Sequence, residues 1–180
     1  ITSFFLTVSP TSIMYIVEHA CKKNKAFCMN LSAPFLCQFF KEPMMKAFPY
    51  VDILFGNEQE ALAFSKEQEF GTENIEEIAL QIQSLPKENE KRSRIVIITQ
   101  EENPIICATD GKITKYPVTY VKAEEIVDTN GAGDAFVGGF LAQYIMEKPL
   151  DVCIRCGIYA ATEVIKQSGC TLPEKSNFIE

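Results

Sequence analysis

The sequence predicts an α/β fold in which helices flank a mostly parallel sheet. Short apolar runs alternate with longer runs of helical period, which is the pattern of repeated strand and helix units. The dipeptide Asp110-Gly111 between two strand-like runs adds an antiparallel hairpin. With 180 residues, of which 47% are apolar, the chain can bury a core, so we expect residues 1–180 to form a single domain.

The first third of the chain is expected to form three strands separated by two helices. Ser9 is a suitable N-cap and Pro10 a suitable first helical residue, so a helix should begin there. The second helix is expected to be interrupted at Pro43, because proline disrupts a helix interior. The expected elements are residues 4–8, 10–23, 26–31, 34–48 and 51–55.

The rest of the sequence predicts a surface helix, an antiparallel edge of the sheet and two C-terminal helices. Apolar residues recur at helical spacing in residues 75–85, and the charged segment 87–94 is expected to be an exposed loop. Right-handed crossovers would place the C-terminal ends of the parallel strands at one edge, where we expect ligands to bind. The later elements are expected at residues 95–99, 105–108, 113–118, between Val127 and Pro149, and at 150–166.

Charge and composition exclude several kinds of partner. The 17 basic and 24 acidic residues give a net charge of −7, which argues against a surface that follows nucleic-acid phosphates. No apolar stretch reaches the roughly 20 residues of a membrane helix, so we expect neither nucleic acid nor a membrane as partner. Seven cysteines scattered over apolar segments resemble buried thiols, which favours a reducing, intracellular compartment.

Residues 128–136, which read Asp-Thr-Asn-Gly-Ala-Gly-Asp-Ala-Phe, carry the clearest chemical signal. Small residues let backbone amides converge at a helix start, where unpaired N–H groups and the helix dipole favour an anion such as phosphate. Asp134 would repel that anion unless it had a separate task, and removing a proton from an attacking hydroxyl is such a task. A simple glycine-rich turn, with Asp134 as an ordinary first-turn residue, stays open as the alternative.

Other motifs are weaker. No P-loop sequence is present, and the turn at Gly131 lacks the third glycine of a dinucleotide motif, because Phe136 stands in its place. Cys153 and Cys156 have the spacing of zinc ligands, but there is no second pair, so a helical packing pair is expected. The only histidine, His19, is expected on a helix surface.

The same motifs resemble those of a known family. Residues 128–136, with Gly138-Gly139 after them, are similar to the C-terminal signature of the ribokinase-like, or PfkB, carbohydrate and nucleoside kinases. Residues 57–60 match the family's N-x-x-E motif, and the two motifs occur in the family's order. Within the family, further segments resemble the adenosine kinases, so that the likeness covers essentially the whole chain. These segments are residues 4–10, 30–35, 49–58 and 169–175.

This resemblance implies a ribokinase-like, doubly wound fold of which the chain is the C-terminal part, with the N-terminal half and its lid missing. The implied activity is ATP-dependent phosphorylation of the adenosine 5'-hydroxyl to AMP in purine salvage, and the fragment alone is expected to be inactive. Mg²⁺ is implied as cofactor, ATP as co-substrate and K⁺ as a further cation. A monomer in the cytoplasm, and also in the nucleus, is implied as well. A degenerate, non-catalytic relative and a sugar kinase of the same family stay open.

By the same resemblance, Asp134 would be the general base that accepts the proton of the 5'-hydroxyl. Backbone amides beside it would stabilise the charge on the transferring phosphoryl group. Those amides belong to Gly131, Ala132 and Gly133. Asp128 and Asn130 would contribute to a monovalent-cation site.

Two further pairs have both an implied role and a simpler alternative. Asn57 and Glu60 would organise magnesium through its waters, but an Asn cap with Glu three residues later is also a good capping arrangement. Phe4 and Phe35 would form part of the apolar wall around adenine, and ordinary core packing is the alternative.

The sequence departs from the family at the border of the implied nucleotide site. Thr99 is followed two residues later by Glu101, where the resemblance implies glycine, so a negative charge stands near the expected triphosphate. Ile158 stands where a polar residue near the nucleotide base is implied. Both departures are expected to weaken ATP binding.

Overall fold

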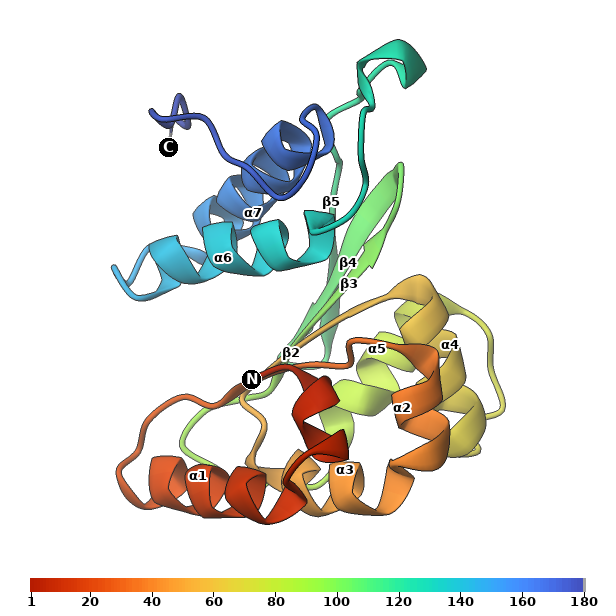
Figure 1. Ribbon diagram of the computed structural model, residues 1–180. Helices are drawn as coiled ribbons and strands as arrows, with labels where there is room; N and C mark the ends of the chain where they lie inside the picture. Colours follow the sequence, from red (N-terminus) through yellow and green to blue (C-terminus); the bar gives the residue numbers. More distant parts are fainter. Residues whose placement is uncertain (180) are drawn as a thin grey trace. The chain divides into compact units, whose positions relative to one another are not determined.

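The computed structural model describes residues 1–179 (Figure 1). The chain divides into two compact units, Ile1–Tyr116 and Pro117–Glu180. The first unit holds the sheet, and the second holds two packed helices. The grouping of residues 1–180 into one domain stays a prediction.

The first unit contains a five-stranded sheet whose strands lie in chain order. Strands β1, β2 and β3 pair in parallel, and β4 and β5 add an antiparallel hairpin at one edge. Asp110 and Gly111 close this hairpin with φ of 50° and 71°, the left-handed conformations that a two-residue turn of this kind needs. The predicted α/β class and its antiparallel edge are confirmed. The strands are β1 (Cys28–Asn30), β2 (Ile53–Asn57), β3 (Ile95–Gln100), β4 (Asn103–Thr109) and β5 (Lys112–Tyr116).

Helices connect the parallel strands, as parallel pairing requires. Helix α5 contacts β3 and β4 and buries Ile78, Ala79 and Ile82, so its predicted amphipathic face is confirmed. His19 is exposed on α1, also as predicted. The α-helices of this unit are α1 (Pro10–Lys22), α2 (Pro34–Phe39), α3 (Lys41–Ala47), α4 (Glu58–Glu67) and α5 (Ile75–Ser84). The 3-10 helices are η1 (Ser3–Thr7) and η2 (Phe48–Tyr50).

The strand predicted for residues 4–8 is wrong, because this segment forms the 3-10 helix η1. Thr2 caps the helix, since its side-chain oxygen accepts the Phe4 N–H at 3.3 Å. The segment meets β1 through one isolated parallel bridge, between Thr2 and Asn30, and Val8 is 73% exposed. The period of so short an apolar run cannot distinguish a strand from a helical turn, and local capping decided between them.

The predicted helix break at Pro43 is also misplaced. The break lies at Phe40, between α2 and α3, where φ of −116° and ψ of 24° depart from the helix. Pro43 is the third residue of α3, in its first turn. No N–H at this position has an intrahelical acceptor, so proline is tolerated there.

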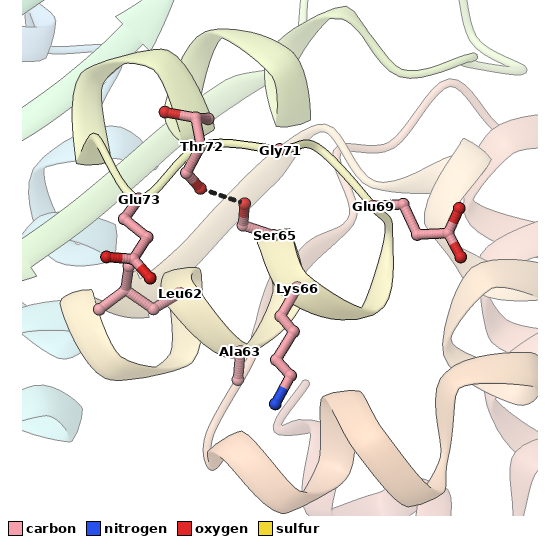
Figure 2. Close-up of a pocket in the computed structure, with 8 residues that line it drawn as sticks. All are labelled: Leu62, Ala63, Ser65, Lys66, Glu69, Gly71, Thr72 and Glu73. Atoms are coloured by element: carbon pink, nitrogen blue, oxygen red, sulfur yellow. Dashed lines mark hydrogen bonds between the residues drawn. The ribbon is translucent and has the colours of Figure 1, made fainter.

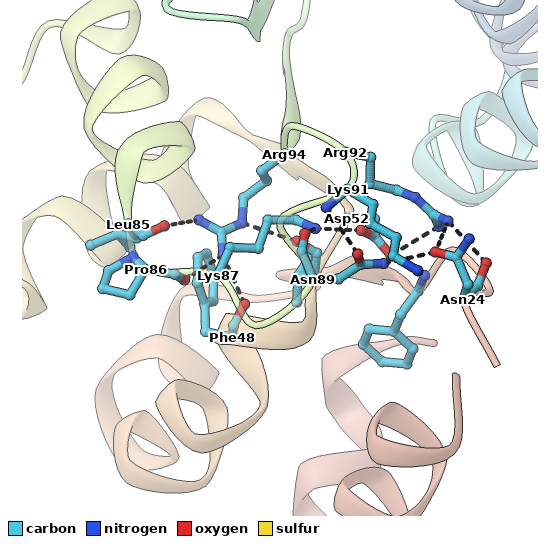
Figure 3. A network of polar contacts seen from close by, with 12 residues as sticks. Asn24, Phe48, Asp52, Leu85, Pro86, Lys87, Asn89, Lys91, Arg92 and Arg94 are labelled. Atoms are coloured by element: carbon cyan, nitrogen blue, oxygen red, sulfur yellow. Dashed lines mark hydrogen bonds and ion pairs between the residues drawn. The ribbon is translucent and has the colours of Figure 1, made fainter. Parts of the chain in front are cut away.

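The segment 87–94, predicted to be an exposed loop, ends in a buried arginine (Figure 3). Arg94 is 1% exposed, and burial lowers its pKa to about 10. Its guanidinium lies 4.8 Å from the centre of the Phe48 ring and donates to five backbone carbonyls. Two of these, on Ile82 and Leu85, belong to the C-terminal end of α5, where carbonyls lack intrahelical partners. Arg94 therefore completes the end of this helix.

A second buried charge anchors the same segment. The carboxylate of Asp52 accepts the Phe27 N–H at 2.9 Å and pairs with Lys87 at 2.5 Å and Arg92 at 3.5 Å (Figure 3). These contacts tie the segment to the start of β2. The charges of this segment were predicted to be solvated, but several of them satisfy buried groups.

The second unit is built on α6 (Ala132–Tyr144) and α7 (Leu150–Ile165), preceded by the 3-10 helix η3 (Ala123–Glu125). The two predicted C-terminal helices are thus confirmed. Cys153 and Cys156 are buried in α7, as expected of a packing pair. Within residues 1–179, no group of three His, Cys, Asp or Glu side chains could hold a metal. None of the helices in this range combines the length and apolar character needed to cross a membrane.

Candidate functional site

The C-terminal ends of the parallel strands bring predicted site residues together in the first unit. Asn57 ends β2 and pairs in register with Thr99 of β3, whose hydroxyl donates to the Gly56 carbonyl at 3.4 Å. Asn30 ends β1 at the same edge. This is the edge at which ligands bind in parallel sheets.

Asn57 and Glu60 form a complete capping box at the start of α4. The Asn57 side-chain oxygen accepts the Glu60 N–H at 2.8 Å, and the Glu60 carboxylate accepts the Asn57 N–H at 3.0 Å. The carboxylate also accepts the Asn57 side-chain amide at 3.1 Å. The helix cap that the sequence offered as the simpler alternative is therefore present. Any metal role of these two residues must be compatible with the cap.

The Glu60 carboxyl group is unusual for a helix cap because it is only 5% exposed. Burial raises its pKa, although N–H groups of Asn57 and Ser32 oppose the shift. Within residues 1–179, no Lys or Arg forms an ion pair with it. A hydrated cation would supply the missing positive charge, and a carboxylate beside an amide oxygen is a donor set that suits magnesium with its waters.

Phe4 and Phe35 lie side by side, with ring centres 5.9 Å apart and an interplanar angle of 59°. Phe4 is 47% exposed and Phe35 is 40% exposed, so neither side chain is part of the core that the described residues form. An exposed aromatic pair offers an apolar surface to a planar ligand.

In the second unit, the glycine-containing motif forms the start of α6 as predicted. Gly131 is the N-cap, with φ of 78°, a left-handed conformation that favours glycine. A Cβ on Gly131 would lie 2.3 Å from the Cys170 sulfur, so a side chain is excluded here for a second reason. A Cβ on Gly133 would meet nothing within 4 Å, so the space beside Gly133 is open.

The amides of this turn are not equivalent. The Ala132 N–H donates to the Thr129 carbonyl at 3.3 Å. Gly133 and Asp134 follow in the first turn, where an α-helix leaves its N–H groups without intrahelical acceptors. The exposed Asp134 carboxylate thus lies beside the N–H groups best placed to receive an anion.

Asp128 and Asn130 also lie close together, but their oxygens already accept hydrogen bonds. Asp128 accepts the N–H groups of Asn130 at 2.9 Å and Gly169 at 3.3 Å, and the Asn130 carbonyl accepts the Cys170 thiol at 3.6 Å. Each of these oxygens keeps a second lone pair, so the monovalent-cation role of the two residues stays a prediction.

The two departures from the family pattern differ in their environment. Glu101 is exposed in the turn after β3 and has φ of 44°, a left-handed conformation. Ile158 is buried in α7. The structure therefore gives a backbone reason for the glycine that the resemblance implies at position 101.

A surface cavity of the first unit lies away from these residues (Figure 2). Its volume is about 690 Å³, and it is bounded by α4 and the loop that follows, where the Ser65 hydroxyl donates to the Thr72 carbonyl at 2.7 Å. None of the predicted site residues lines it.

Comparison with known proteins identifies the family. Residues 1–177 match the pfkB family of carbohydrate kinases. The chain belongs to the pfkB family. It is 52% identical over 178 residues to adenosine kinase 2 of Arabidopsis thaliana, a match that covers 99% of this chain and 52% of that protein. Over 170 residues it is 48% identical to adenosine kinase of Schizosaccharomyces pombe, covering 94% of this chain and 50% of that protein.

Solved structures of pfkB relatives agree with the fold. Anopheles gambiae adenosine kinase in complex with P1,P4-di(adenosine-5) tetraphosphate has a TM-score of 0.92 and 50% identity, covering 97% of this chain and 52% of its own. Schistosoma mansoni adenosine kinase in complex with 2-fluoroadenosine has a TM-score of 0.92 and 36% identity, covering 96% and 51%. The predicted ribokinase-like class is confirmed, and the chain spans about half the length of these relatives.

Sequence reasoning missed two features of this pfkB chain. Ser32 has φ of 70°, and its hydroxyl joins Thr2 at 2.8 Å and the Ser3 N–H at 3.0 Å, beside the aromatic pair. Gly169 and Cys170 contact the turn before α6 across about 40 positions of sequence. No periodicity could have revealed either contact, because both depend on chain segments that are distant in sequence.

Proposed function

We propose that this chain is the phosphoryl-transfer half of an adenosine kinase, which converts adenosine and ATP to AMP and ADP. The observation that carries the proposal is the start of α6. There the Asp134 carboxylate is exposed in the same turn as N–H groups without helical acceptors, directly after the left-handed Gly131. A base beside an anion-binding turn suits the transfer of a phosphoryl group to a hydroxyl.

In the proposed reaction, Asp134 accepts the proton of the adenosine 5'-hydroxyl as its oxygen attacks the γ-phosphorus. The bond from that phosphorus to the β–γ bridging oxygen breaks, and ADP leaves with the electron pair. The N–H groups of Gly131 and Gly133 would face the charge that develops on the transferring group. The Ala132 N–H would join them by giving up its bond to the Thr129 carbonyl. Such donors, fixed before the reaction, lower the barrier without reorganising.

Asn57 and Glu60 would hold magnesium through its waters. The chemistry supplied there would be positive charge that offsets the charge of the ATP phosphates. The capping box supports this role because it fixes both side chains in one arrangement before any ion binds. The buried, unpaired charge of Glu60 also favours a cation nearby.

Phe4 and Phe35 would contact the adenine ring of the acceptor. Their exposed, adjacent rings suit a purine better than a sugar, which favours a nucleoside over a carbohydrate acceptor. The relatives described above are adenosine kinases, which favours the same acceptor. We also propose the purine-salvage role and the monomeric state by this similarity.

A chimera tests the proposed function. The half of Arabidopsis adenosine kinase 2 that lies upstream of the matched region would be joined to Ile1, and AMP formation from adenosine and ATP would be followed. We expect Mg²⁺-dependent AMP formation by the chimera, none by residues 1–180 alone, and no phosphorylation of free ribose or fructose. Phosphorylation of a sugar in preference to adenosine would identify a sugar kinase, and an inactive, folded chimera would indicate a degenerate relative.

A further inference from the structure

Ser32 lies between β1 and α2 in a conformation that is unusual for a residue with a side chain. Its φ of 70° is in the left-handed region, where a Cβ is disfavoured. Its N–H donates to the side-chain oxygen of Asn30, the last residue of β1, at 3.0 Å. A residue other than glycine keeps such a conformation only where its surroundings hold it.

The Ser32 hydroxyl makes every hydrogen bond that a hydroxyl can make. It donates to the Asn30 carbonyl at 3.0 Å and accepts the Ser3 N–H at 3.0 Å. The Thr2 hydroxyl lies 2.8 Å away and supplies the third bond, with Thr2 as donor because the Ser32 proton is already used. Thr2 is the N-cap of η1 and Ser3 its first residue, so one hydroxyl ties the start of η1 to the turn after β1.

These bonds connect the two elements that carry the exposed aromatic pair. Phe4 is the second residue of η1, and its N–H donates to the Thr2 hydroxyl at 3.3 Å. Phe35 is the second residue of α2 and lies three positions after Ser32. The Ser32 hydroxyl thus joins the start of one ring-bearing helix to the turn that leads into the other, and the ring centres lie 5.9 Å apart.

Removal of this hydroxyl should displace η1 without detaching it. The Ser3 hydroxyl also donates to the Asn30 carbonyl, at 2.6 Å, and this bond does not involve Ser32. The Ser32 N–H, for its part, lies near the Glu60 carboxylate and opposes the rise of its pKa. Because this N–H belongs to the backbone, it survives substitution of the side chain. The hydroxyl acts on the aromatic side of the site, and the N–H acts on the side of the capping box.

We infer that Ser32 is a positioning residue for the purine: its hydroxyl holds η1 against the turn before α2 and so keeps the Phe4 and Phe35 rings at the spacing that receives a flat base. This inference rests on the proposed function, because the spacing of the rings affects turnover only if they contact adenine. It concerns binding of the acceptor and not the transfer step at Asp134.

Two substitutions remove the hydroxyl with different effects on the backbone. Ser32→Gly suits the left-handed φ, whereas Ser32→Ala keeps a Cβ in that conformation and should be the less stable of the two. Ser84→Ala is the matched control. The Ser84 hydroxyl is exposed on α5 and donates within its own helix, to the Gln81 carbonyl at 2.9 Å.

Hydrogen exchange on the 180-residue chain measures the structural part. The amide of Ser3, a fully buried residue, should exchange roughly tenfold faster in both Ser32 variants, because it loses its acceptor. The Asn57 amide, which belongs to the capping box, should keep its parent rate. Neither amide should respond to Ser84→Ala. A Ser3 amide that exchanges at the parent rate in Ser32→Gly would overturn the inference.

Kinetics of the adenosine kinase chimera measure the positioning part. Both Ser32 variants should raise KM for adenosine by roughly five- to tenfold, because loss of the hydroxyl's bonds lets the rings move apart. The kcat, the KM for ATP and the Mg²⁺ concentration needed for half-maximal activity should not change. A general loss of folded enzyme would instead lower kcat, and would do so more in Ser32→Ala than in Ser32→Gly. That pattern, with the parent KM for adenosine, would overturn the inference.

The outcomes also separate this inference from the proposed function. If the unaltered chimera makes AMP and Ser32→Gly has the parent KM for adenosine, the inference falls and the proposed function stands. If the unaltered chimera, correctly folded, makes no AMP, the proposed function falls and the positioning role falls with it. Faster Ser3 exchange together with a higher KM for adenosine alone supports both.

Discussion

Gly139 of α6 faces Cys156 of α7 so closely that a Cβ on Gly139 would lie 2.6 Å from the Cys156 carbonyl oxygen. The added Cβ would also lie 2.9 Å from the Cβ of Ala160. Neither neighbour can move freely, because one is backbone and the other is a Cβ of the same helix. Gly139 therefore sets how closely the two helices pack, although the sequence presented it only as part of a motif.

Gly139→Ala should destabilise the protein by about 1–3 kcal/mol, because the added methyl group forces the two helices apart. Gly138 is the matched control, since a Cβ there would meet nothing within 4 Å. Gly138→Ala should stabilise by about 0.5–1 kcal/mol through higher helix propensity. Urea denaturation followed by circular dichroism measures both. Equal effects of the two substitutions would show that the helices do not pack this closely in solution.

Asp134→Asn in the chimera should lower kcat by roughly 10²- to 10⁴-fold, because the variant keeps the shape of the side chain but cannot accept the proton. Binding of a non-hydrolysable ATP analogue, measured by calorimetry, should change far less. Asp151→Asn is the control for charge, because Asp151 is an exposed carboxylate of α7 whose ion pair, with Arg155, lies within the helix. If Asp134→Asn turned over adenosine at the parent rate, Asp134 would be an ordinary first-turn residue and not the base.

Glu60→Gln should remove the charge while retaining an oxygen for the Asn57 N–H, so the capping box is largely kept. The folded-state pKa of Glu60 is raised above its ordinary value of 4.5, so the folded protein binds more protons than the unfolded chain between these two values. Its contribution to the free energy of unfolding therefore falls as pH rises through that interval. In urea titrations at a series of pH values, Glu60→Gln should lose this dependence.

The same variant separates the cap from the metal role. In the chimera, Glu60→Gln should raise the Mg²⁺ concentration needed for half-maximal activity by roughly tenfold, since a neutral amide holds a hydrated cation less well than a carboxylate. Glu60→Ala should lose the cap as well and lower stability by about 1 kcal/mol. An unchanged Mg²⁺ requirement in Glu60→Gln would leave Glu60 with its capping role alone.

Glu101→Gly should stabilise the protein by roughly 1 kcal/mol, because glycine adopts the left-handed φ of this turn without the penalty of a side chain. The neighbouring Glu102 does not have positive φ, so Glu102→Gly removes the same charge and should destabilise slightly. Thermal unfolding measures both. A stabilisation of equal size in the two variants would point to charge instead of backbone conformation.

The effect of Glu101 on ATP needs a variant that removes only the charge. Glu101→Gln keeps the side chain, and in the chimera it should strengthen binding of an ATP analogue by up to about tenfold if the carboxylate lies near the triphosphate. This gain should shrink as salt increases, because an exposed charge is screened. If Glu101→Gln leaves the affinity for the ATP analogue unchanged at low salt, Glu101 points into solvent and does not weaken ATP binding.

Much of the fold follows from local sequence. The alternating apolar runs predicted the parallel strands β1, β2 and β3, and Asp110-Gly111 predicted the hairpin, because backbone conformation at such a turn depends on two residues alone. The cap at Ser9-Pro10 placed the start of α1 correctly. The glycine motif likewise predicted the start of α6, since small residues and a first-turn acid are local signals.

The sequence by itself thus determined the α/β class, most element positions and the identity of the candidate base, Asp134. Tertiary structure alone decided which charges are buried: Arg94 looked solvated in its charged segment, yet it completes a helix end with carbonyls that the sequence does not place near it. It also decided that Phe4 and Phe35 are exposed partners and that Asp128 meets Gly169. The physical reason is that turns and caps are set by neighbours along the chain, whereas desolvation and long-range hydrogen bonds depend on which distant segments exclude water together.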